Sequence, residues 1–302
     1  MSLKPRPLPE GGTIAIIAPS SRGDVAALEP NIDALKMHGY HVVLHDQVHL
    51  EHHQSAGTPA QRARAIMDVF ADPSIDAIIA ARGGNRSMHT LPLLDFDVIR
   101  KNPKPFVGFS DSTALVNALH AKTGLVTYHG PSVSRIARGS PAEQDQMIAC
   151  LQGRGASLDF SSATTMRGGR AAGRLIGGNL SMMAALVGTP YMPDTAGAIL
   201  FIEDINDQLS RYDRMLAQLA LSGVLSGAAA IIFGLMAPEG DSAVTPFGFE
   251  VADILREHAH GLNIPVIMDA PFGHKGPLWT LPVGGMASLN ADTGVLTLED
   301  PA

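Results

Sequence analysis

Short apolar runs alternate with segments of helical periodicity along the first 130 residues. The run Thr13–Ala18 is almost wholly apolar and is followed by Pro19, as is typical of a strand buried on both faces of a parallel sheet. Similar runs follow at 40–44, 75–80 and 105–109, and helices are expected around 28–38, 63–70, 92–100 and 114–120. This alternation predicts an α/β fold, with a doubly wound parallel sheet whose ligands bind beyond the carboxyl ends of the strands.

The pattern changes over residues 132–172, where small residues and arginine dominate and only Glu143 to Leu151 keeps a helical period. Beyond it, strands are expected at 174–180, 198–202, 228–233 and 264–268, helices at 181–187, 212–219 and 249–258, and a hairpin over 287–298. We therefore predict an α/β domain over 1–140, a linker over 141–170, and a smaller, β-rich α+β domain over 171–302.

Composition narrows the class of protein. The 302 residues are 45% hydrophobic and 17% charged, which is enough chain to bury a sizeable core. The net charge of -7, without a run of Lys or Arg, argues against a nucleic-acid or anionic-membrane partner. One cysteine excludes an internal disulfide framework, and neither a signal peptide nor a membrane span is recognised, so a cytoplasmic protein is expected.

The first chemically suggestive stretch surrounds Ser110. An apolar segment runs directly into a predicted helix, and the positions two before and two after the serine are the small residues Gly108 and Ser112. A serine on such a strand-to-helix turn is a candidate nucleophile, with helix N–H groups aimed at the same point. The stretch fits a helix N-cap by Ser110 or Asp111 equally well.

A serine nucleophile needs a base and an acid that orients the base. His274 lies in a glycine-flanked loop after a predicted strand, where a solvated histidine is the ordinary interpretation. Glu203 follows the strand at 198–202, where a capping or ion-pair acid is the commoner role, and Asp204 and Asp207 are rivals for it.

These stretches together resemble the LD-carboxypeptidase family of serine peptidases (muramoyl-tetrapeptide carboxypeptidases). No single match is specific, but they occur in the family's order and span nearly the whole chain. They are Gly12–Ser21, Arg82–Gly84, Gly108–Asp111, Tyr128–Pro131, Gly177–Leu180, Phe201–Asp204 with Asp213–Leu216, and Gly273-His274 with Leu281–Gly284.

The resemblance implies Ser110 as nucleophile, His274 as general base and Glu203 as orienting acid. In the mechanism that follows, the N–H of Asp111 and an N–H of Gly83 or Gly84, here assigned to Gly84, would form the oxyanion hole, and Arg82, Gly83 and Asn179 would contact the substrate. For Arg82, binding of a substrate carboxylate and a structural ion pair are equally good interpretations. The implied protein is a cytoplasmic homodimer that needs no metal or cofactor and removes terminal D-alanine from murein tetrapeptides in peptidoglycan recycling.

One departure from the family pattern follows Arg82-Gly83-Gly84, where Asn85 and Arg86 replace the usual aromatic residue and glycine. This departure leaves substrate preference near the turn open.

Other site chemistries are weaker. Five histidines between His41 and His53 have a spacing that would suit zinc on a helix, but part of the run reads as a strand. Cys150 lies in a helical stretch and is expected to be a core thiol rather than a nucleophile. Ser20 and Ser112 lack the small-residue frame of Ser110.

Two other functions remain possible from the sequence. A related hydrolase could cleave acyl-adenylate or peptide-nucleotide antibiotics, as microcin-immunity relatives of the family do, with Trp279 as a candidate stacking surface. A non-catalytic ligand-binding module on the same scaffold is the third possibility, and the intact Ser110, Glu203 and His274 set argues against it.

Overall fold

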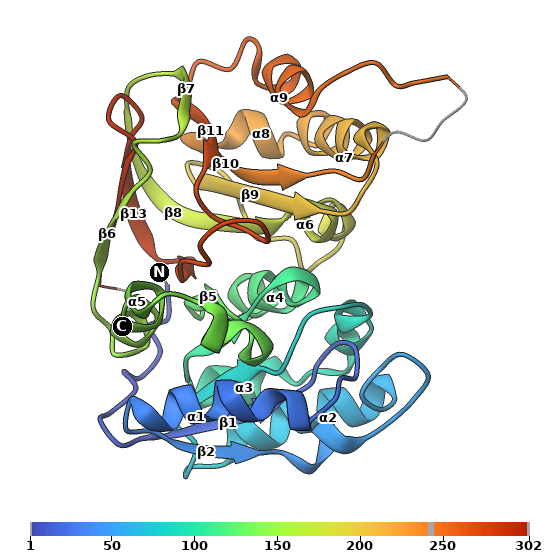
Figure 1. The fold of residues 1–302 in the computed structure, drawn as a ribbon, viewed down its shortest axis with the longest axis vertical. Helices are drawn as coiled ribbons and strands as arrows, with labels where there is room; N and C mark the ends of the chain where they lie inside the picture. The colour runs from blue at the N-terminus through green and yellow to red at the C-terminus, as the bar shows by residue number, and fades with distance from the viewer. Residues whose placement is uncertain (1, 241–244, 301–302) are drawn as a thin grey trace.

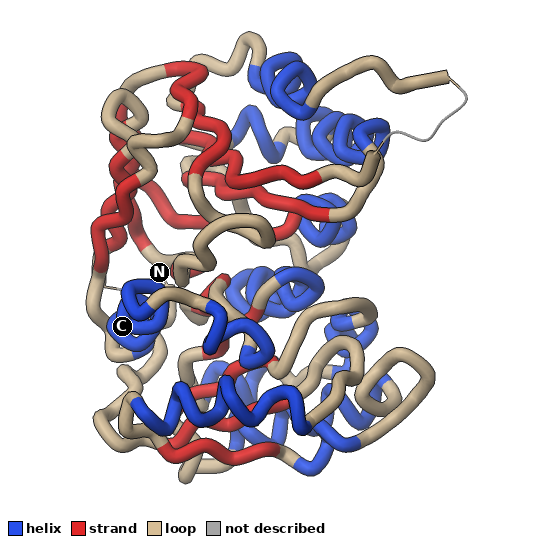
Figure 2. Tube along the Cα trace, viewed as in Figure 1, coloured by secondary structure: helices blue, strands red, loops and turns tan. Residues whose placement is uncertain are grey.

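The computed structural model describes residues 2–240 and 245–300. Its strands form two sheets, one of six and one of eight strands, which occupy the lower and upper parts of the molecule in Figure 1. Helices and strands alternate in the lower part, whereas strands dominate one side of the upper part (Figure 2). The predicted α/β fold with a β-rich second part is confirmed.

The six-stranded sheet has the order β12-β5-β4-β3-β1-β2. Its five N-terminal strands pair in parallel, and β12 pairs antiparallel with β5. The chain reverses its direction of winding between β1 and β3, which is where open α/β sheets bind ligands. The strands are β1 (Thr13–Ile17), β2 (His41–Leu44), β3 (Ala77–Ala80), β4 (Phe106–Gly108), β5 (Thr127–His129) and β12 (Leu281–Val283).

The helices of this part place their apolar faces on the sheet. A capping box at Thr58 and Gln61 starts α2, and Ser140 and Glu143 form another at the start of α5. The helix expected over 92–100 is divided, because Asp95 caps a new helix after a 3-10 segment that contains Pro92. The helices are α1 (Glu29–Met37), α2 (Pro59–Ala71), α3 (Phe96–Lys101), α4 (Thr113–Thr123) and α5 (Pro141–Leu151), with 3-10 turns at Ala26–Leu28, Asp46–His49, Ser87–Leu93, Ser110–Ser112 and Val133–Arg138.

The eight-stranded sheet has the order β6-β14-β13-β8-β9-β10-β11-β7. Its two edge strands, β6 and β7, are separated by only four residues in the chain, so the sheet must curl to bring its edges together. The strands are β6 (Ala156–Asp159), β7 (Thr164–Arg167), β8 (Arg170–Asn179), β9 (Ile199–Ile205), β10 (Ala230–Ala237), β11 (Val266–Ala270), β13 (Met286–Asn290) and β14 (Val295–Leu298); the helices are α6 (Leu180–Leu186), α7 (Leu209–Leu221), α8 (Val224–Gly227) and α9 (Val251–Ala259).

Two features differ from the pattern in the sequence. The segment 141–170, expected as a linker, contains α5 together with β6 and β7, which are both strands of the second sheet. Strand β12, from the second half of the chain, completes the first sheet. Both strands of the expected hairpin are present, as β13 and β14.

Helix α4 joins the two sheets. It contacts β4 and β5 of the first sheet and β8 and α6 of the second part, and residues 113–119 are all buried. Figure 1 shows α4 at the level where the two parts meet. Within residues 2–240 and 245–300, no helix combines the length and apolar character required to cross a bilayer.

Candidate active site

Ser110 occupies a strained turn between β4 and α4. Its φ is 59°, in the left-handed region that a non-glycine residue enters at a cost of about 1–3 kcal/mol. A Cβ placed on Gly108 would lie 2.7 Å from the Cβ of Ser112, so the two small positions around the serine touch each other. The small residues at positions 108 and 112 are thus required by the close packing of the turn, which has the geometry of a nucleophile elbow.

The helix-cap interpretation of this stretch is not what the structure shows. Ser112 is the N-cap of α4, and its side chain makes no capping hydrogen bond. The buried Asp111 carboxylate accepts a hydrogen bond from the Ser87 N–H at 2.9 Å, and its backbone carbonyl accepts one from the Ser87 hydroxyl at 2.7 Å. Asp111 therefore anchors the neighbouring loop and leaves Ser110 without a capping role.

The turn after β3 lies against Ser110. A Cβ on Gly83 would approach the Ser110 Cβ to 2.8 Å and its Oγ to 3.1 Å. In the described chain, the N–H groups of Gly83 and Gly84 donate no hydrogen bond to another protein atom. Arg82 is exposed, forms no ion pair with a described carboxylate, and donates from Nη1 to the Arg22 carbonyl at 3.2 Å. The turn beside the serine thus carries two backbone N–H groups without a protein partner among the described residues.

Replacing Gly83 with alanine is expected to lower catalytic turnover at least tenfold, because the added methyl group would displace the Ser110 side chain. Steady-state kinetics on a peptide substrate would measure the change. Gly227→Ala is the matched control, since its Cβ would make only ordinary contacts at 3.9 Å. Wild-type turnover in Gly83→Ala would contradict the close approach seen here.

Glu203 and His274 form a direct pair. The His274 Nδ1 lies 2.6 Å from Glu203 Oε2, and the His274 backbone N–H donates to the same oxygen at 3.1 Å. Glu203 is fully buried on β9, whereas the His274 side chain is 12% exposed. With Nδ1 protonated toward the carboxylate, Nε2 is left as the basic nitrogen.

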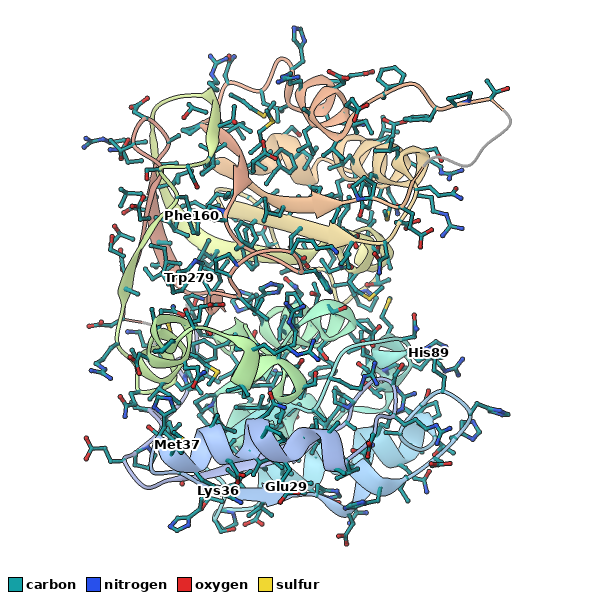
Figure 3. All side chains as sticks on the ribbon, in the orientation of Figure 1. Glu29, Lys36, Met37, His89, Phe160 and Trp279 are labelled. Atoms are coloured by element: carbon teal, nitrogen blue, oxygen red, sulfur yellow. The ribbon has the colours of Figure 1, made fainter. Side chains whose placement is uncertain are left out.

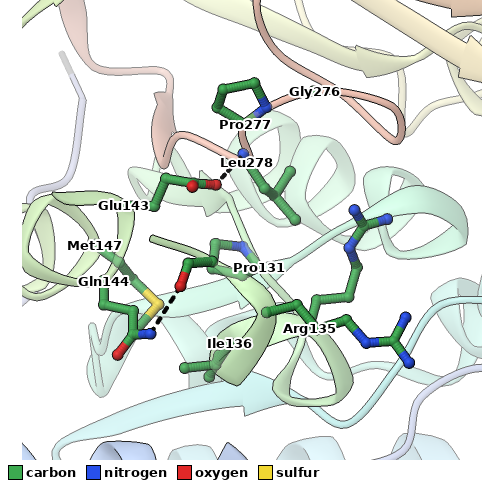
Figure 4. Close-up of a pocket in the computed structure, with 11 residues that line it drawn as sticks. Pro131, Arg135, Ile136, Glu143, Gln144, Met147, Gly276, Pro277 and Leu278 are labelled. Carbon is green, nitrogen blue, oxygen red and sulfur yellow. Dashed lines mark hydrogen bonds between the residues drawn. The ribbon is translucent and has the colours of Figure 1, made fainter. Parts of the chain in front are cut away.

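The His274 loop between β11 and β12 is fastened to the first part of the molecule. Arg135 Nη2 donates to the His274 carbonyl at 3.1 Å. Glu143 accepts from the Leu278 N–H at 2.6 Å, and Gln146 exchanges two hydrogen bonds with the Thr280 backbone. Figure 4 shows Arg135, Glu143 and Leu278 around a cavity of about 150 Å³ beside this loop. The His274 loop is thus held by residues that sequence patterns did not single out, although Glu143 and Gln146 share one face of α5.

Phe109 connects the pair to the serine. Its ring centroid lies 4.3 Å from that of His274, and the Arg135 guanidinium carbon lies 5.5 Å from its centre. Ser110, the next residue, makes no side-chain hydrogen bond within residues 2–240 and 245–300. Nucleophile–base hydrogen bonds are often long in unliganded enzymes and shorten when substrate binds. The structure therefore brings the three predicted residues into one region without a Ser110–His274 hydrogen bond.

A second histidine, His129 at the end of β5, is buried beside the pair. Desolvation lowers the pKa of His129 to about 4, with the nearby His274 adding to this effect and the charge of Glu203 opposing it. His129 is therefore neutral at physiological pH. In the sequence it was noted only as part of the Tyr128–Pro131 match.

The buried His129 predicts a specific dependence of stability on pH. In the unfolded chain a histidine has a pKa near 6.5, so below that pH His129 is protonated in the unfolded state but still neutral in the folded state. The free energy of unfolding should thus fall, by on the order of 3 kcal/mol from this group, as pH drops from about 7 to 4. Urea unfolding of wild type and His129→Phe at both pH values would measure it. Equal pH dependence in the two proteins would contradict the prediction.

Asn179 lies at the end of β8, where it is buried and its side chain is occupied. Its Nδ2 donates to Asp204 Oδ1 at 2.8 Å, and its Oδ1 accepts from the Met182 N–H at 3.3 Å. Asp204 Oδ2 also accepts hydrogen bonds from the backbone N–H and the hydroxyl of Ser181. Asp204, a rival of Glu203 in the sequence, therefore serves the start of α6 and makes no described bond to His274.

The sequence also raised Trp279, Cys150 and a metal site as candidates. Trp279 is partly buried against the hydrophobic core, on the side where β13 and α5 lie (Figure 3). Burial raises the pKa of the Cys150 thiol to about 12, which removes its nucleophilic form at neutral pH. Within the described residues, no group of three or more His, Cys, Asp or Glu side chains is arranged to hold a metal ion.

Two family models cover most of the chain. Residues 14–130 match the LD-carboxypeptidase N-terminal domain, and residues 172–289 match the LD-carboxypeptidase C-terminal domain. The chain belongs to the LD-carboxypeptidase family. The family supports a peptidase, and the N-terminal match contains the Ser110 turn while the C-terminal match contains Glu203 and His274.

Relatives of this chain include two kinds of named protein. A Bacillus subtilis protein named "probable murein peptide carboxypeptidase" is 32% identical, over 99% of this chain and 95% of its own. The muramoyltetrapeptide carboxypeptidase of Oxalobacter formigenes is 35% identical and superposes with a TM-score of 0.85, over 95% and 99% of the two chains. The wild-type structure of the microcin C7 self-immunity protein MccF, a protein known from Escherichia coli, is 26% identical with a TM-score of 0.88, over 98% of both chains.

Proposed function

We propose that this member of the LD-carboxypeptidase family is a serine-type enzyme that removes terminal D-alanine from the L,D-peptide bond of murein tetrapeptides. The observation that carries the proposal is the buried Glu203–His274 pair beside the strained Ser110 turn. These groups come from the two sheets, so the site depends on the docking of both parts of the molecule. The relatives named as murein carboxypeptidases support the substrate class.

In the proposed reaction, Ser110 Oγ attacks the carbonyl carbon of the L,D-bond while His274 Nε2 takes the hydroxyl proton. Glu203 holds the imidazole with Nδ1 protonated and stabilises the imidazolium that forms. The proton then passes to the leaving D-alanine nitrogen as the C–N bond breaks. Water, activated by the same histidine, cleaves the acyl-serine ester and regenerates Ser110.

The oxyanion and the substrate carboxylate need separate donors. The N–H groups of Asp111 and Gly84 are proposed to bind the oxyanion, and the unpaired Gly84 N–H supports this role. Arg82, with its exposed guanidinium and no carboxylate partner among the described residues, is proposed to bind the free carboxylate of the terminal amino acid, and Gly83 lines the same turn. A substrate contact from Asn179 is a weaker part of the proposal, because its amide already binds Asp204.

The direct test is release of D-alanine from a muramoyl tetrapeptide, followed by mass spectrometry of the tripeptide product. Turnover by the native protein supports the proposal. An intact tetrapeptide after long incubation with a folded sample would reject this substrate. The proposal also includes a cytoplasmic homodimer acting in peptidoglycan recycling, and light scattering of the purified protein would check the dimer.

The similarity to MccF supports a second candidate, hydrolysis of acyl-adenylate or peptide-nucleotide compounds by the same three residues. Trp279 packs partly into the core, which weakens it as a stacking surface for a base. Incubation with an acyl adenylate, with release of the nucleotide as readout, separates the two substrate classes. A fluorophosphonate probe that labels Ser110 would exclude a non-catalytic binding module.

A further inference from the structure

His129 lies where the two sheets approach each other. It is the last residue of β5, with Gly108 of β4 on one side and Leu281 of β12 on the other. Its side chain has no exposed surface. A Cβ on Gly178 of β8 would lie 3.1 Å from its Nδ1, so the ring reaches the second sheet where that strand carries no side chain. His129 thus crosses the boundary between the two sheets.

The His129 ring belongs to a row of four rings that links the candidate catalytic groups. The ring of His274 lies 4.3 Å from that of Phe109, Phe109 lies 5.1 Å from His129, and His129 lies 5.2 Å from Phe201. Phe109 precedes Ser110 directly. Phe201 and Glu203 are two residues apart on β9, so their side chains project from the same face of the strand. The row therefore includes His274 itself and lies next to Ser110 and Glu203 in the chain.

A histidine is an unfavourable choice for this position on grounds of stability. Neither ring nitrogen of His129 has a hydrogen-bond partner in the structure, and burying such groups costs free energy. A phenylalanine of similar shape would fit between Phe109 and Phe201 without that cost. Glu203 Oε1, on β9 of the second sheet, is likewise buried and unpartnered. Polar groups kept at such a cost next to a reactive pair require a functional explanation.

We infer that His129 is a positioning residue, whose neutral imidazole holds Glu203 and the His274 ring in the arrangement that lets His274 act as a base. This inference rests on the proposed serine mechanism. The neutral ring of His129 contacts Phe201, two residues from Glu203 on β9, and does not compete with His274 for the charge of the carboxylate. A cation at His129 would take part of that charge, and a purely apolar ring would leave the carboxylate in less polar surroundings.

The charged groups around His129 agree with this role. Glu203 on β9 and His274 on the loop act on its titration, and Arg135 from the 3-10 turn at 133–138 lies against Phe109 in the same row. Because burial keeps His129 neutral well below physiological pH, it does not become a second cation near Glu203 over the range in which a peptidase works.

The first test replaces His129 with phenylalanine. We expect kcat on the proposed peptide substrate to fall about 10- to 100-fold with KM within about twofold, because the buried side chain cannot touch substrate. The melting temperature should stay equal or rise. A residue that matters only for packing would instead lose stability together with activity.

Tyr128→Phe is the matched control. Tyr128 is the preceding residue on β5, is also fully buried, and has a hydroxyl without a partner, but its side chain lies on the opposite face of the strand. Removal of the Tyr128 hydroxyl should leave kcat unchanged and should not lower the melting temperature. His129→Gln, which restores a neutral polar group, should recover part of the activity lost in His129→Phe.

A measurement that does not need turnover separates this inference from the proposed function. In ¹⁵N NMR of histidine-labelled protein, we expect wild-type His274 to be protonated at Nδ1, and this preference to weaken in His129→Phe but not in Tyr128→Phe. If no peptide is hydrolysed but His274 responds in this way, the proposed substrate is wrong and the positioning role stands. Unchanged His274 signals in a folded His129→Phe protein, wild-type kcat in that variant, or a loss of stability as large as the loss of activity would each overturn the inference.

Discussion

Ser110→Ala is expected to lower kcat/KM for the scissile peptide by roughly three or more orders of magnitude, the loss that removal of a triad nucleophile produces. The change deletes only the hydroxyl, so the Glu203–His274 pair should remain and substrate should still bind. Discontinuous assays of D-alanine release over hours would measure the residual rate. A variant with wild-type activity would show that Ser110 is not the nucleophile.

The strained backbone offers an internal control for this result. Alanine at position 110 keeps the unfavourable φ of 59°, whereas glycine adopts it freely. Ser110→Gly should thus be as inactive as Ser110→Ala but more stable, by about 1 kcal/mol in urea unfolding. Two inactive proteins of different stability would separate loss of chemistry from loss of fold.

Glu203→Gln is expected to reduce kcat by about 10²- to 10⁴-fold. The glutamine amide can present an N–H to His274 Nδ1, which would move the proton to Nε2 and remove the basic nitrogen that Ser110 needs. It also removes the negative charge that stabilises the imidazolium. Steady-state kinetics with intact far- and near-UV circular dichroism spectra would establish the effect.

Glu257→Gln serves as the control for Glu203→Gln, because Glu257 is exposed on α9 and has no described contact with the site. Its activity should equal that of the native protein. If Glu203→Gln also retained full activity, the buried pair would be a structural feature and Ser110 would require another base.

The sequence predicted β1 to β4 well because each is a short apolar run followed by its own helix, whereas β5 and β12 of the same sheet were not predicted. The turn at Ser110 was also readable, since Gly108 and Ser112 report a steric requirement that is local in the chain. Glu203 and His274 were assigned their roles through a resemblance covering nearly the whole chain, because the two paired residues lie 71 positions apart.

What the sequence could not show depends on contacts between distant segments. Strands β6 and β7 are short and polar on their exposed sides, so they carry little periodic signal before β14 and β11 pair with them. The supports of the His274 loop at Arg135, Glu143 and Gln146 are ordinary surface residue types, recognisable only when α5 and the loop meet. His129 was noted only as part of the Tyr128–Pro131 match, and nothing in the sequence placed it between the two sheets.

Strand β12 has a consequence for dividing this molecule. The two family matches suggest that a cut between residues 130 and 172 would yield two independent domains, but the first fragment would lack residues 281–283 and expose the edge of β5. An open edge of this kind recruits other chains and promotes aggregation. Split-protein reporters or domain exchanges between relatives should therefore carry the C-terminal strand along with the N-terminal sheet.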